Sequence, residues 1–230
     1  MAGDRGTTLT GMSTHPLAPL VELPGVVDAA ERAGDAVAAV HRHRANLRGW
    51  PSTAMEASWR GGRASAAIDG GSVELRRDGD YDDPGEGRIS TKWTHGTLGE
   101  ADGLPLCTPE ELQQLVGVYR RAPAQALARL HVLAAADLVG DPDELGRPRP
   151  GAEVSARLDM LGQVITARPA VPAAVVAAVV HGELLALSPF GQANGIVARG
   201  ASRLACVATG LDPHNLWVPE VAWLRRAADY

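Results

Sequence analysis

The residues best suited to chemistry lie at 188–199, between two long segments rich in Ala, Val and Leu. Asn194 is a favoured helix N-cap residue, and Gly195 beside it leaves the free amides at a helix start open to close approach. Such amides receive phosphate or carboxylate groups. Arg199 and Arg203 are four residues apart, so one helix face presents both guanidinium groups to an anion at the loop. This segment therefore predicts an anion-binding loop, although a plain helix hairpin with an Asn cap is the simpler alternative.

Two core helices must position this loop. Apolar residues recur with helical spacing from Val171 to Leu187, and Pro189 disfavours helix at Ser188. The second apolar series follows the loop and continues to Gly210. We therefore expect a helix, a turn of a few residues and a second helix.

A second candidate site lies at the end of an earlier helix, expected over about residues 51–70. Asp69 falls in its last turn, where an acidic residue opposes the helix dipole by a few tenths of a kcal/mol to about 1 kcal/mol. Asp69 therefore calls for a cationic partner, although solvation alone would also serve.

The loop at 188–199 resembles the Fic (Fido) family, whose members mostly transfer AMP from ATP to a hydroxyl side chain of a target protein. The family pattern is His-x-Phe-x-(Asp/Glu)-Gly-Asn-Gly-Arg-x-x-Arg, often with Pro after the His. The matching positions are Pro189, Phe190, Asn194, Gly195 and Arg199. His181 supports this register, because family members often carry a His seven residues before the motif His.

The earlier helix end also resembles a Fic motif. The sequence Ser65-Ala66-Ala67-Ile68-Asp69-Gly70 is similar to the inhibitory motif (Ser/Thr)-x-x-x-Glu-(Gly/Asn), in which the Glu reaches the last Arg of the active-site loop and blocks productive nucleotide binding. The resemblance implies that Ser65 and Asp69 are inhibitory residues and that Asp69 pairs with Arg199.

The departures from the pattern fall on the groups that carry the family's chemistry. Ser188 stands in place of the catalytic His, and losing a general base typically costs about 10²–10⁴-fold in rate. Gln192 replaces the carboxylate that holds Mg²⁺ on the nucleotide, and a neutral amide is a poor ligand for that hard cation. Ala193 replaces a Gly, and Ile196 replaces an Arg that would contact phosphate.

The resemblance thus implies a degenerate Fic-type nucleotidyltransferase fold without AMP-transferase activity. ATP or another nucleotide is the implied ligand, held by Phe190, Gln192, Asn194, Gly195 and Arg199. Such a protein would act by binding a partner protein or a small phosphate-bearing molecule. The alternative is an active transferase that uses another base, His181 or His95, or another phosphate-containing donor. Direct nucleophilic catalysis by Ser188 would need a neighbouring base that the sequence does not show.

We expect an all-α fold, in which residues 1–23 form a loose arm and residues 24–230 form one Fic-like helical domain. The stretch 141–151 passes straight into a helix at 152–166, so the β-hairpin flap with which Fic proteins grip their targets is predicted to be shortened or absent. Segment 76–107 is expected to be mainly a loop.

The amino-acid composition narrows the classes of protein that remain possible. The 230 residues are 45% apolar, which is enough to form one hydrophobic core. The net charge of −5 does not indicate nucleic-acid binding. No long uncharged apolar run or leader is present, which predicts a cytoplasmic protein that does not bind membranes. Cys107 and Cys206 are expected to be unpaired thiols, and no spacing indicates a metal site. The alternating acids at 78–82 lack the Gly and Glu of a calcium loop.

Overall fold

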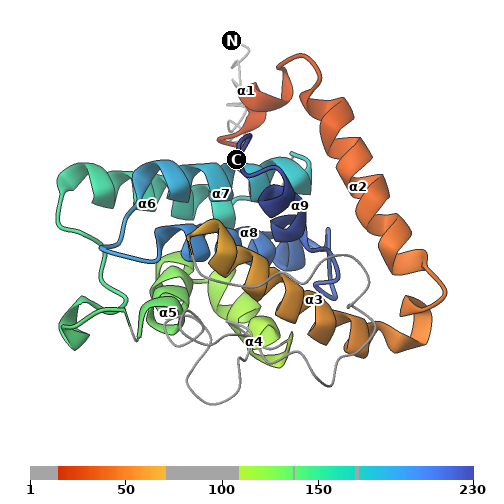
Figure 1. Ribbon diagram of the computed structural model, residues 1–230. Coiled ribbons are helices and arrows are strands. Elements are labelled where there is room, and N and C mark those ends of the chain that lie inside the picture. Colours follow the sequence, from red (N-terminus) through yellow and green to blue (C-terminus); the bar gives the residue numbers. More distant parts are fainter. Residues whose placement is uncertain (1–14, 71–108, 137, 169–170) are drawn as a thin grey trace, which may run out of the picture.

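The computed structural model describes residues 15–70, 109–136, 138–168 and 171–230, and every element in these ranges is helical (Figure 1). The all-α prediction is confirmed for this part of the chain. The elements are α1 (Ala18–Val21), α2 (Val26–Arg42), α3 (Asn46–Ile68), α4 (Pro109–Tyr119), α5 (Pro123–Ala135), the 3₁₀ turn η2 (Pro142–Glu144), α6 (Ala152–Thr166), α7 (Ala173–Leu187), α8 (Asn194–Thr209) and α9 (Pro219–Arg225).

The core is centred on α7 and α8, the two helices that the apolar spacing predicts. Val180 and Leu184 of α7 and Leu204 of α8 are fully buried. Burying side chains of this size stabilises a fold by about 1.5–3 kcal/mol each. The turn between the two helices is therefore held by the best-packed part of the protein.

The other helices surround this pair. Helix α6 packs on α7, while α4 and α5 pack on α8 from below in the view of Figure 1. Helix α3 crosses the front of the molecule and contacts both α8 and α9. Helix α2 runs down the right-hand side and contacts α3 and α7.

Helix α3 begins earlier than expected. It starts at Asn46 and not near residue 51, so Pro51 lies inside the helix. Asn46 explains the early start: its buried side chain donates to the Val40 carbonyl at 2.7 Å and accepts from Thr53 Oγ1 at 2.7 Å, which fixes the turn between the helices.

The end of the predicted N-terminal arm is ordered and packed. Residues 18–21 form α1, and Leu17 is buried in the main core. The His15 ring accepts a hydrogen bond from the Leu17 amide at 3.0 Å, which fixes the entry into α1. Residues 15–21 thus pack against the core through Leu17 and Val21, while residues 1–14 lie outside the described ranges.

The connector at 141–151 holds only η2 and irregular backbone before α6 begins at Ala152. The predicted helix at 152–166 is confirmed. The expected loop at 76–107, with His95 and Cys107, lies outside the described ranges.

Candidate functional site

The loop between α7 and α8 is closed by Asn194. Its side-chain oxygen accepts from the Phe190 amide at 2.8 Å, and its side-chain nitrogen donates to the Phe190 carbonyl at 2.9 Å. Asn194 was expected to cap α8, but it is the first helical residue, and Ala193 occupies the cap position with a left-handed φ of 55°. The cap prediction is corrected because both polar groups of the Asn194 side chain are used to hold the loop.

Phe190 anchors the loop in the core. It is 2% exposed and stacks on the ring of His131 from α5, with ring centroids 4.2 Å apart. His131 Nδ1 accepts from the Gly146 amide at 2.9 Å, so this ring joins the loop, α5 and the 141–151 connector. Burial lowers the pKa of His131, and the main chain of Gln192 partly offsets that effect. Phe190 is therefore a packing residue here, and Gln192 is exposed.

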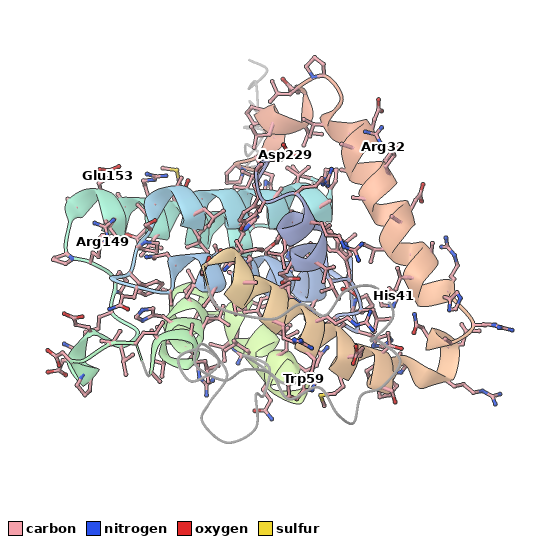
Figure 2. All side chains as sticks on the ribbon, viewed as in Figure 1. Arg32, His41, Trp59, Arg149, Glu153 and Asp229 are labelled. Carbon is pink, nitrogen blue, oxygen red and sulfur yellow. The ribbon has the colours of Figure 1, made fainter. Side chains whose placement is uncertain are left out.

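Arg149 is a residue that the sequence analysis missed. Its side chain, labelled in Figure 2, donates to the Ser188 carbonyl at 2.8 Å and to the Leu187 carbonyl at 2.9 Å. Its amide also donates to the Pro189 carbonyl at 2.7 Å. A cation at the C-terminal end of α7 suits the helix dipole and satisfies carbonyls that the helix leaves free. Its position in a proline-rich connector gave no signal for this role.

Ser188 is the C-terminal cap residue of α7. It adopts a left-handed conformation with φ of 45°, and its hydroxyl donates to the Leu185 carbonyl at 3.0 Å. The hydroxyl is thus engaged with the last turn of its own helix.

Arg199 is as deeply buried as Phe190, another of the predicted site residues. It is 2% exposed, and its Nε donates to Ser65 Oγ at 2.6 Å while its Nη2 donates to the Ser65 carbonyl at 3.0 Å. Two parallel donors of one guanidinium are therefore matched to one residue at the end of α3. The structure brings Ser65 and Arg199 together.

Asp69 completes the site. Its Oδ1 lies 2.8 Å from Arg199 Nη2, and its side chain is 26% exposed. A β-carbon added to Gly195 would lie 2.5 Å from Oδ1 and 2.8 Å from Oδ2, so the carboxylate rests against the backbone at the start of α8. A helix start and a guanidinium both favour negative charge. The position expected to receive an anion is thus occupied by a carboxylate from α3.

His181 and Tyr230 extend this polar network. Tyr230 Oη accepts from Arg199 Nη1 at 3.3 Å and is hydrogen bonded to His181 Nε2 at 2.8 Å. The His181 ring stacks on Trp223 with centroids 4.6 Å apart. Burial, reinforced by the positive charge of Arg199, lowers the pKa of His181 to about 4. His181 is therefore neutral near pH 7 and a weak base.

Arg203 does not join Arg199 at the anion position. Its Nε donates to Asn215 Oδ1 at 2.8 Å, and its Nη1 lies 3.5 Å from Glu220 Oε1. Glu220 is nearly fully buried, so it needs a cation nearby. The expected pair of arginines at the loop is wrong, because Arg203 is held on α9 and on the segment that precedes it.

No cluster of three or more His, Cys, Asp or Glu residues in the described ranges could hold a metal ion. Cys206 is a free, buried thiol, and burial raises its pKa to about 12. None of the described helices combines the length and the apolar character that a membrane span requires. Comparison with known proteins gives no relative: no protein-family model, curated protein or solved structure matches this chain.

Proposed function

We propose that this protein is a degenerate Fic-like protein that has lost AMP transfer and binds a phosphate-bearing ligand at the start of α8. Asp69 competes with that ligand. The protein then acts by binding, and the nucleotide or other phosphate compound is the signal that displaces Asp69 from Arg199.

The observation that carries this proposal is the position of the Asp69 carboxylate, which lies against Gly195 and beside Arg199. It supports a site that accepts negative charge, since a carboxylate already sits there. It also agrees with the inhibitory role that the family resemblance implies for Ser65 and Asp69. The left-handed Ala193 adds support, because the family pattern has Gly at this position and Gly adopts that conformation freely.

The loss of AMP transfer is supported by the side chains at positions 188 and 192. The Ser188 hydroxyl is bonded to the Leu185 carbonyl, and Gln192 offers a neutral amide where the family has a carboxylate. The alternative of an active transferase with another base has weaker support. His181 has a pKa of about 4, and its Nε2 is engaged by Tyr230. His95 lies outside the described residues.

Calorimetry with pyrophosphate and with ATP tests the binding site. We expect Asp69→Asn to bind pyrophosphate about fivefold more tightly than the unmodified protein, the effect of about 1 kcal/mol from a competing, partly exposed carboxylate. Glu56→Gln is the matched control, since Glu56 is on the same helix and pairs with Arg60. It should leave the affinity unchanged.

Two results would overturn the proposal. Equal pyrophosphate affinity in Asp69→Asn and the control would mean that Asp69 does not compete for the site. Incubation with labelled ATP, Mg²⁺ and lysate should give no labelled protein. Labelling that disappears in Asn194→Ala and Arg199→Ala would instead establish the transferase alternative.

A further inference from the structure

A second feature is a cavity of about 580 Å³ between α2 and α7. Ala29, Ala30 and Ala33 of α2 face Ala174, Ala177 and Ala178 of α7 across it. Trp217 and Trp223, from the segment that precedes α9 and from α9 itself, also line it. Small side chains on both helices therefore leave space that the aromatic residues do not fill.

Two polar groups in the wall have protein partners. His181 Nε2 is hydrogen bonded to Tyr230 Oη at 2.8 Å, and Ser202 Oγ donates to the Ala177 carbonyl at 3.2 Å. No Asp, Glu, Lys or Arg is among the described residues that line the cavity. A charged ligand would be desolvated here without a counter-charge.

The volume of the cavity limits the size of the ligand that it can hold. One turn of an α-helix with side chains is about 10–12 Å wide and 5.4 Å tall, so it fills roughly 500 Å³. A helix from a partner protein would therefore place little more than one turn in this space. Small-molecule pockets range over about 300–1,000 Å³.

From these observations we infer that the cavity between α2 and α7 is a binding site for an uncharged, hydrophobic small molecule. Trp217 and Trp223 supply flat apolar contact area, and the alanines of α2 and α7 supply the room. The cavity and the Arg199 network share His181, which lines the cavity and is hydrogen bonded to Tyr230.

Nile red fluorescence tests the inference, with 1-decanol, decanoate and decylammonium as competitors at pH 7. We expect saturable binding of one Nile red per chain and displacement by decanol. Decanoate and decylammonium should need at least tenfold higher concentrations. Quenching of tryptophan fluorescence by bound Nile red should report the same affinity, because Trp217 and Trp223 line the cavity.

Substitutions that fill the cavity test whether Nile red binds there. Ala178 lines it and is exposed at its opening, so Ala178→Phe should weaken Nile red binding at least tenfold without crowding the core. Ala33→Phe should do the same from α2. Ala186→Phe and Ala36→Phe, at exposed positions of α7 and α2 away from the cavity, should leave binding unchanged.

Three outcomes would overturn the inference. One is the absence of saturable binding by Nile red and by decanol. Another is equal displacement by the charged competitors. The third is a dimer in sedimentation velocity that Ala178→Phe dissociates, since the opening would then be a contact between two copies of the chain.

Discussion

Ser188 and Ala193 bracket the loop in left-handed conformations, with φ of 45° and 55°. For a residue with a β-carbon this conformation costs roughly 1–2 kcal/mol. The loop keeps it because Asn194 holds the Phe190 backbone and Phe190 is buried against His131. The shape of the loop is thus maintained by its neighbours rather than by its own backbone preference.

Replacing Ala193 with Gly should therefore stabilise the protein. We expect Ala193→Gly to raise the free energy of unfolding by about 0.5–1 kcal/mol, because Gly relieves the left-handed strain at a smaller entropic cost. Urea denaturation measures this. Ala36→Gly, at an exposed helical position of α2, should instead lower stability by about 1 kcal/mol. Destabilisation by both substitutions would contradict a left-handed Ala193.

His181 should make stability depend on pH. Its pKa falls from 6.5 to about 4 in the fold, so between these values the unfolded chain binds more protons than the folded one. The contribution of a neutral His181 is therefore complete above pH 6.5 and is lost as the pH falls towards 4. The ring is partly exposed, so we expect a loss of about 1–2 kcal/mol rather than the full value of the shift.

His181→Phe tests this, since Phe keeps an aromatic ring against Trp223 and cannot be protonated. Urea denaturation at pH 7 and pH 5 should show a smaller loss of stability in His181→Phe than in the unmodified protein. His43→Gln, at an exposed histidine after α2, should retain the full loss. An unchanged pH dependence in His181→Phe would refute the lowered pKa.

At the scale of helices, Gly61 determines how closely α3 approaches α8. A β-carbon at Gly61 would lie 2.0 Å from Arg203 Nη1, and Arg203 is held by Asn215 and Glu220. Gly61→Ala should therefore displace Arg203 and leave the carboxylate of Glu220 buried without its cation. We expect a loss of about 1–3 kcal/mol in the free energy of unfolding.

Gly49 provides the matched control on the same helix. A β-carbon there would meet nothing within 4 Å, so Gly49→Ala should stabilise the protein by about 0.5–1 kcal/mol. Opposite signs for the two Gly→Ala substitutions are expected in thermal or urea denaturation. A stabilising Gly61→Ala would mean that Arg203 can move away from the new methyl group without lowering the free energy of unfolding.

Local patterns predicted the helices better than they predicted the roles of polar side chains. Apolar spacing and Pro189 located α7, α8 and the turn between them, because those signals act within a few residues. The pairing of Asp69 with Arg199 was expected only through the family resemblance. Arg149 and Arg203 were missed or misplaced because their partners, Ser188 and Glu220, lie far along the chain. Asn46, which starts α3, gave an equally weak signal.

At the scale of the molecule, stability should be uneven. Helix α8 has ten buried residues, whereas α2 has only Ala30 and Val37. The apolar cavity also lies between α2 and α7. Helix α2 is also held by His41, which is labelled in Figure 2 near the end of the helix. Its Nε2 lies 2.7 Å from Asp212 Oδ1. Helix α2 should therefore open without unfolding α7 and α8.

Hydrogen–deuterium exchange read by mass spectrometry checks this difference. We expect peptides of α2 to exchange through local opening, at least tenfold faster than peptides of α7 and α8, which need global unfolding. His41→Ala should accelerate exchange in α2 alone, because it removes the contact with Asp212 while the core stays intact. Equal protection of α2 and α8 would show that the helices unfold as one unit. In that case the small buried surface of α2 would not set its stability.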